Sequence, residues 1–129
     1  MLQIPKALLE KRITKETLHR SGKRLLKEIV GRLKLPEASY DIRSCKGGDG
    51  VMGEVILHSD HLYLMVHLGS GSVLRVLYRT CEGRKDYSGG MNHYASVSEL
   101  ASTTAAERFI AKLDKLNELG KRQHAFQAA

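Results

Sequence analysis

The sequence predicts one α+β domain, in which a four-stranded antiparallel meander sheet follows a long basic helix and precedes a second helix. Two observations predict this fold. Apolar residues recur with helical spacing over residues 15–35 and again over residues 105–119. Between these segments, residues 40–81 form four short runs of alternating apolar and polar side chains, separated by glycine-rich or polar turns. Short turns favour antiparallel pairing of successive strands, and 129 residues fit a single domain.

The N-terminal part is expected to be helical in two pieces. Residues 1–13 fit an arm or a short helix, with Pro5 at a first helical position. Thr14 is the expected N-cap of the long helix. Pro36 disfavours helical geometry at the residue before it and ends that helix. The apolar stripe of the long helix consists of Leu18, Gly22, Leu25, Leu26, Ile29 and Leu33.

Four strands are expected next, at residues 40–45, 51–58, 61–68 and 73–81. The third is the clearest, because Leu62, Leu64, Val66 and Leu68 alternate with polar or half-polar residues.

A long connection is expected after the fourth strand, over residues 82–95. A short helical turn near residues 97–101 follows, with Ser96 and Glu99 as its capping box. Thr104 is the expected N-cap of the last helix, which runs from about residue 105 to 119. Gly120 is its expected end, and residues 121–129 are expected to be a frayed tail.

Charge limits the classes of partner. Lys and Arg number 21 against 14 Asp and Glu, which gives a net charge of +7. This balance favours nucleic acid, an acidic protein surface or an anionic membrane, although solubility alone also accounts for it. No run approaches the roughly 18 to 20 apolar residues of a membrane span, so no membrane contact is expected.

The remaining features favour a cytoplasmic protein. The N-terminus lacks the pattern of a signal peptide. Cys45 and Cys81 are expected to be reduced, although one disulfide between them stays open.

Three groups of residues are candidates for contacts to nucleic acid. The outer side of the 15–35 helix spreads cations over about 20 Å, which suits several phosphates. The polar side of the sheet combines Arg, Tyr and His, which can stack on bases. The connection after the fourth strand adds cations to a glycine pair that lets backbone N–H groups approach an anion. In the order of the three groups, the candidates are Arg20, Lys23, Arg24, Lys27 and Lys34; Tyr63, His67, Arg75 and Arg79; and Arg84, Lys85, Tyr87 and His93.

Each group also fits a structural role: a solvated helix face, an ordinary outer sheet face and a packed strap, respectively. No motif specifies a reaction, since the phosphate-binding loop spacing and a nucleophile with its base are both missing. His58 and His61 flank a turn, but the usual zinc-ligand spacing is missing, so neither a metal nor a cofactor is expected. A metal-independent nuclease would need only the residue types of the third group, with His93 as acid or base.

Residues 78–90, with the sequence YRTCEGRKDYSGG, resemble small uncharacterised proteins encoded on bacterial mobile elements. The resemblance implies an accessory role on a plasmid, an integrative element or a phage, including inhibition of a host defence protein. The helix–sheet–helix order is also similar to that of double-stranded RNA-binding domains. The chain departs from these domains in its fourth strand and in the lack of a Lys-rich start to its last helix, so we do not assign it to them.

The leading hypothesis is a small non-enzymatic binding protein that contacts nucleic acid or a nucleoprotein complex through a positive surface. Two alternatives stay open: a mobile-element inhibitor that binds a host defence protein, and a small metal-independent RNase or toxin. The sequence also leaves open a homodimer, and it does not choose between DNA, RNA and an acidic protein as the partner.

Overall fold

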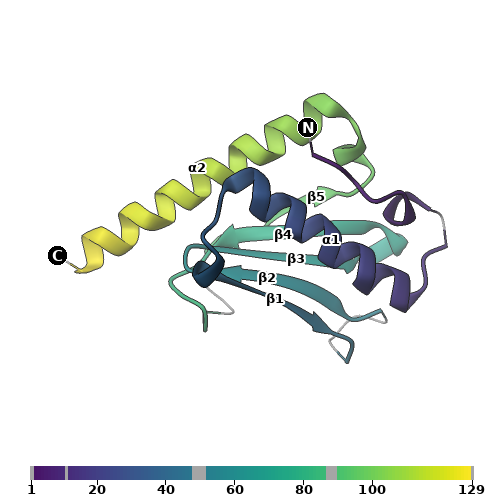
Figure 1. The fold of residues 1–129 in the computed structure, drawn as a ribbon, viewed down its shortest axis with the longest axis horizontal. Coiled ribbons are helices and arrows are strands. Elements are labelled where there is room, and N and C mark those ends of the chain that lie inside the picture. Colours follow the sequence, from purple (N-terminus) through teal and green to yellow (C-terminus); the bar gives the residue numbers. More distant parts are fainter. Residues whose placement is uncertain (1, 11, 48–51, 87–89, 129) are drawn as a thin grey trace.

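A computed structural model describes residues 2–10, 12–47, 52–86 and 90–128, with the backbone alone at residues 70 and 124–128. It shows an antiparallel five-stranded sheet with two long helices (Figure 1). The strands lie side by side in chain order: β1 (Tyr40–Cys45), β2 (Glu54–Ser59), β3 (Leu62–Leu68), β4 (Leu74–Thr80) and β5 (His93–Ser96). The α+β class and the antiparallel sheet are therefore confirmed, whereas the expectation of four strands is wrong.

The additional strand, β5, lies in the segment that the sequence assigned to a long connection. It pairs with β4, with Tyr94 opposite Leu77 and Ala95 opposite Val76. Its four residues are too few to give a period-two signal. Pairing at this edge satisfies backbone groups of β4 that would otherwise face solvent.

Helix α1 (Lys15–Leu33) packs closely on one face of the sheet. The Thr14 hydroxyl accepts a hydrogen bond from the Thr17 N–H at 3.2 Å, which confirms the expected N-cap. An added Cβ at Gly22 would lie 3.1 Å from Cγ2 of Val55, so glycine permits the close approach of helix and strand. The buried large apolar side chains of the helix are Leu18, Leu25, Leu26, Ile29 and Val30.

Helix α2 (Thr103–Ala128) is longer than expected, and its C-terminal end extends past the sheet (Figure 1). The Ser102 hydroxyl, rather than that of Thr104, accepts a hydrogen bond from the first turn, at 3.5 Å from the Ala105 N–H. Gly120 does not end the helix, because residues 121–128 continue it. A Cβ at Gly120 would lie 2.9 Å from Cβ of His61, so this glycine allows α2 to contact the β2–β3 turn.

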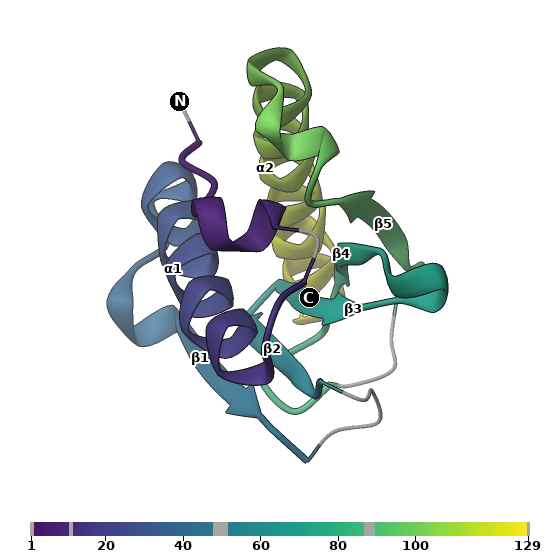
Figure 2. The same ribbon diagram turned by 90° about the vertical axis from the view of Figure 1, so that its right-hand side faces the viewer.

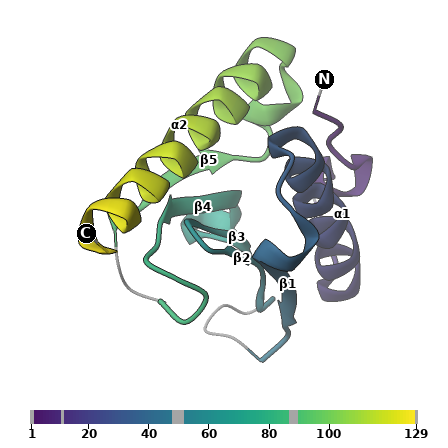
Figure 3. The same cartoon turned by 60° about the vertical axis from the view of Figure 1, so that its left-hand side comes forward.

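Both helices cover the same face of the sheet, and they diverge across it (Figure 3). The main core lies between them and the strands, and it also buries Leu2 and Leu8 of the N-terminal segment. That segment forms the short helix η1 (Lys6–Leu9), which lies beside α1 (Figure 2). The opposite face of the sheet carries a smaller cluster of Ile56, Tyr63, Leu77 and Cys81.

Two sequence expectations about cysteines and membranes can be compared with the structure. Cys45 and Cys81 are both free thiols. Within the described residues, no helix combines the length and the apolar character that a bilayer crossing needs.

Candidate anion-binding surface

The outer side of α1 carries a group of exposed cations, which we call the basic surface: Arg20, Lys23, Arg24, Lys27 and, from the turn after β1, Lys46. Within the part of the chain that the structure describes, none of these five side chains forms an ion pair or a hydrogen bond. Their charges are therefore open to an anion from solvent. Lys46 was missed by the sequence analysis, because only the fold brings the end of β1 next to α1.

A pocket of about 390 Å³ lies between α1 and the end of β1, and all five cations of the basic surface line it. The other lining residues are Glu16, His19 and Ser44. One carboxylate against five cations leaves the pocket strongly positive. Field lines converge in a hollow lined by one sign of charge, which raises the local concentration of anions.

His19 and Ser44 hold the two walls of this pocket together. His19 is only 3% exposed, and its Nε2 lies 2.8 Å from the carbonyl oxygen of Met52. Because a carbonyl oxygen only accepts, Nε2 carries the hydrogen of this bond. Nδ1 of the same ring contacts the Ser44 hydroxyl. The imidazole thus connects α1 to β1 and to the segment before β2, which fixes the spacing of the cations around the pocket.

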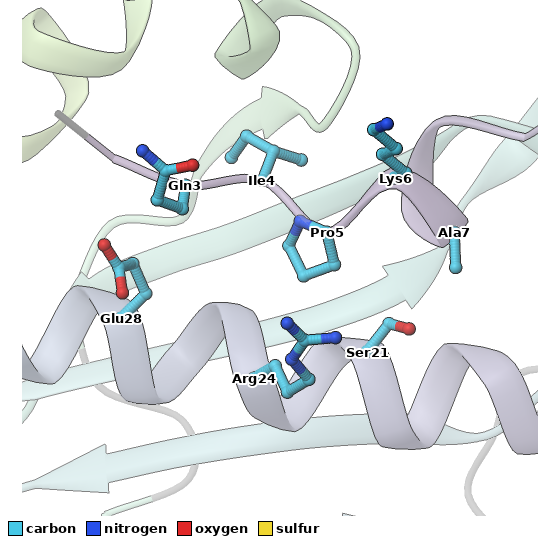
Figure 4. Close-up of a pocket in the computed structure, with 8 residues that line it drawn as sticks. All are labelled: Gln3, Ile4, Pro5, Lys6, Ala7, Ser21, Arg24 and Glu28. Carbon is cyan, nitrogen blue, oxygen red and sulfur yellow. The ribbon is translucent and has the colours of Figure 1, made fainter.

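A second pocket, of about 480 Å³, lies between α1 and the N-terminal segment (Figure 4). Arg24 lines this pocket as well as the first one, so the basic surface continues across it. The second pocket has mixed charge, because Lys6 and Arg24 share it with Glu28. Figure 4 shows the Arg24 guanidinium between the helix and Pro5, with the Glu28 carboxylate one turn further along. The more positive of the two pockets is the one beside β1.

The polar side of the sheet lies opposite the helices, and two of its candidate residues are buried. Tyr63 is 8% exposed and Arg79 is 2% exposed. The Arg79 guanidinium lies 4.4 Å from the centre of the Tyr63 ring and donates to the carbonyl oxygens of Thr80 and Asp86, both at 3.1 Å. Packing therefore occupies the ring face and the donors that the sequence analysis assigned to bases and phosphates.

The other two candidates on this side, His67 and Arg75, are half-buried. Arg75 Nε donates to His67 Nε2 at 3.3 Å, and its guanidinium stacks on Tyr94 at 4.2 Å from the ring centre. Burial, followed by the charge of Arg75, lowers the pKa of His67. These side chains project from the sheet face that α1 does not cover. They are therefore separated from the basic surface by the sheet.

The described part of the connection after β4 is tied to the rest of the molecule. Arg84 Nη1 donates to the Ala38 carbonyl oxygen at 3.0 Å, and Arg84 Nη2 lies 3.2 Å from an Asp41 carboxylate oxygen. Asp86 accepts a hydrogen bond from the Glu82 N–H at 2.9 Å. Arg84 is thus held beside β1, at one edge of the sheet.

The remaining candidates of the third group do not join Arg84. His93 belongs to β5, at the opposite edge of the sheet, and its ring stacks on Tyr78 with 5.3 Å between ring centres. Lys85 is exposed, and Tyr87 lies outside the described residues. The structure therefore does not bring Arg84 and His93 to one reaction centre.

Buried titratable groups on the second sheet face support the fold. His58 is fully buried, and its Nε2 lies 2.8 Å from the Gly83 carbonyl oxygen. Burial lowers the pKa of His58, the hydrogen bond to Gly83 opposes this shift, and the charge of Arg43 adds to it. Burial also raises the pKa of the Cys81 thiol to about 11, so Cys81 stays protonated at neutral pH and is a poor nucleophile.

Within the described residues, no three His, Cys, Asp or Glu side chains are grouped as metal ligands. Comparisons of this chain with protein-family models, with curated proteins and with solved structures find no match. We therefore infer its function from its own residues and their geometry.

Proposed function

We propose that this chain is a small non-enzymatic protein that binds nucleic acid through the basic surface of α1 and Lys46. The observation that carries the proposal is the convergence of five exposed cations, without partners among the described residues, around one pocket. Four other cations of the described residues are paired with carboxylates, among them Arg84 with Asp41 and Arg32 with Glu107 at 2.8 Å. Within the described part of the chain, the basic surface therefore gathers five cations without ion pairs around one pocket, which suits a polyanion.

The shape of the basic surface supports an extended partner. Arg20 and Lys27 are two helical turns apart, which corresponds to about 10 Å along α1. A nucleic acid duplex presents one phosphate charge per about 1.7 Å of its axis, so several phosphates can face this length. Cations dominate the lining of the pocket, and the imidazole of His19 is buried and held by Ser44 and Met52. We therefore expect contacts to the phosphate backbone with little preference for sequence.

A salt titration tests the proposal. The affinity for labelled DNA and RNA, single- and double-stranded, would be measured by fluorescence anisotropy from about 50 to about 200 mM salt. If all five cations contact phosphate, the logarithm of the affinity for duplex DNA falls with a slope of about −4.5 against the logarithm of the salt concentration. The proposal would be refuted if the protein bound none of these four nucleic acids at low salt.

A charge-matched pair of variants assigns the binding to the basic surface. Replacing both Lys23 and Lys27 by Ala should weaken binding and reduce the salt slope by about 2, because two phosphate contacts are lost. The control replaces Arg108 and Lys115 by Ala, two exposed cations of α2 that line neither pocket beside α1. Equal losses in the two double variants would show that net charge, and not the basic surface, determines binding.

A further inference from the structure

A third pocket, of about 210 Å³, lies where the chain after α1, the β2–β3 turn and α2 meet. It shares no lining residue with either pocket beside α1. At about 30 Å³ per water molecule, it has room for about seven waters, which is the space of a ring-sized group. It is therefore a separate candidate site for a small ligand.

The amide of Asn117 is a polar group of this pocket that the described residues leave without a partner, whereas the Ser39 and Ser59 hydroxyls donate to backbone carbonyl oxygens. Asn117 is only 5% exposed and lines the pocket from α2. Within the described residues, its side chain has no hydrogen-bond partner. A primary amide offers two donor hydrogens and an acceptor oxygen. Neither amide atom of Asn117 is among the fully buried polar atoms that lack a partner, so the amide is open to the space of the pocket. The amide is thus available to a ligand that presents a donor and an acceptor side by side.

The other lining residues indicate two further properties of a ligand for this pocket. Leu33, Leu35 and Pro36 form an apolar wall, which suits the flat face of a ring. Lys34 and Lys121 stand at the rim and are exposed. Lys34 forms no ion pair within the described part of the chain, whereas Lys121 pairs with Glu118 at 3.1 Å. A ligand for this pocket therefore combines a ring with an anionic group.

One carboxylate lines the pocket, and it shares its cation with a second carboxylate, that of Asp41. Asp60 also lines the pocket, but its carboxylate lies 3.7 Å from Nη1 of Arg84. His61, the next residue of the turn, adds a second nitrogen-containing side chain to the lining. Lys34 therefore remains the main attraction for an anionic group at this pocket.

We propose that this pocket binds a nucleotide, with the base inserted toward Asn117 and the phosphate held by Lys34 and Lys121. Nucleobase edges place hydrogen-bond donors and acceptors side by side, and an amide side chain is complementary to such an edge. The ring packs on the apolar wall, and the phosphate lies at the rim. This site is distinct from the basic surface, and the proposal does not depend on nucleic-acid binding by α1.

NMR titration of the full chain tests the proposal. The probes are adenosine, cytidine, guanosine and uridine 5′-monophosphates, with ribose 5-phosphate lacking the base and adenosine lacking the phosphate. We expect amide shifts at the pocket, including the side-chain amide of Asn117, with at least one nucleotide. Ribose 5-phosphate and adenosine should each bind at least about tenfold more weakly than that nucleotide, because each lacks one anchoring group.

Two variants separate base recognition from charge. Asn117→Leu keeps the branched shape and the number of heavy atoms and removes the amide, so nucleotide binding should weaken at least about tenfold. Lys34→Glu changes an exposed residue, so it tests the site even if the first variant does not fold. It should weaken nucleotide binding and leave adenosine binding unchanged. The Lys23 and Lys27 double variant should retain nucleotide binding.

Three results would overturn the proposal. The first is the absence of shifts at the pocket with every nucleotide. The second is equal binding of ribose 5-phosphate and of nucleotides, which would indicate a phosphate response alone. The third is unchanged nucleotide affinity in folded Asn117→Leu or in Lys34→Glu. None of these results bears on the salt-dependent binding by the basic surface, so the two proposals can fail independently.

Discussion

Two glycines in helices of this chain have opposite surroundings. A Cβ at Gly31, in α1, would meet no atom within 4 Å, whereas a Cβ at Gly120, in α2, would lie 2.9 Å from Cβ of His61. Gly31→Ala should raise the free energy of unfolding by up to about 1 kcal/mol, because alanine favours the helix. Gly120→Ala should lower it by about 1 kcal/mol or more, because the added methyl group clashes with the β2–β3 turn.

Urea unfolding of the two alanine variants measures this difference. The variants make the same chemical change in the same kind of element, so helix propensity contributes equally to both. A gain of stability in Gly120→Ala would contradict the close contact of α2 with His61.

Some candidate binding residues could be predicted from the sequence, and others could not. Four of the five cations predicted for the outer side of the first long helix share one exposed surface, because helical spacing places Arg20, Lys23, Arg24 and Lys27 together. Lys34, the fifth, follows the end of α1 in a left-handed conformation and lines a different pocket. Lys46 and Asn117 were missed, because their surroundings come from segments far apart in the chain. Arg79 and Arg84 were predicted to contact nucleic acid. In the fold their guanidinium groups instead contact the Asp86 carbonyl oxygen and the Asp41 carboxylate, respectively.

At the scale of elements, the two helix starts differ in how well the sequence identifies the cap. The Thr14 hydroxyl accepts the Thr17 N–H, as the sequence indicated, whereas α2 is capped by Ser102 instead of Thr104. Thr14→Ala should therefore lower the free energy of unfolding by about 1 kcal/mol. Thr104→Ala is the matched control, and it should change the free energy of unfolding by less than about 0.5 kcal/mol. Thermal unfolding of both variants checks the expectation, and equal losses would contradict the assigned caps.

The strands were predictable where alternation was long and the turns were short. β1 and β3 follow the expected positions closely, and each hairpin turn forces its neighbours to be antiparallel. β5 could not be found in this way, because its formation depends on an unpaired edge of β4 and not on its own pattern. The extension of α2 through Gly120 was missed because a glycine usually ends a helix, and only the contact with His61 explains its presence.

At the scale of the whole molecule, the three predicted groups of binding residues do not share one side. The basic surface lies over the helix-covered face, whereas His67 and Arg75 project from the opposite face. Arg84 and His93 are at opposite edges of the sheet. Net charge is a property of the composition, but its distribution over faces requires strand pairing and helix placement, so the sequence could not supply it.

The second sheet face makes stability dependent on pH. Burial lowers the pKa values of His58 and His67 below their usual 6.5. The unfolded chain therefore binds protons that the folded chain does not, so stability is complete above about pH 7 and is lost as the pH falls through the lowered values. The groups facing His58 are Arg43, Arg79, Tyr63 and Asp86.

Urea unfolding between about pH 8 and about pH 5 tests this dependence. The free energy of unfolding should fall with decreasing pH, and His58→Gln should reduce the slope because one of the two titrating groups is removed. His67→Gln alone should also reduce the slope of the free energy of unfolding against pH. A stability that rises on acidification would contradict neutral, buried imidazoles in the folded state.

The strand order has a consequence for self-association. A sheet with two open edges can recruit a second copy through its unpaired backbone groups, and such growth leads to fibrils. Here one edge strand, β5, has only four residues, and the other, β1, carries the opposite charges of Asp41 and Arg43 on one side. Short length and charge are two devices that discourage edge-to-edge stacking. The chain can thus present a strongly cationic helix while remaining protected against ordered aggregation.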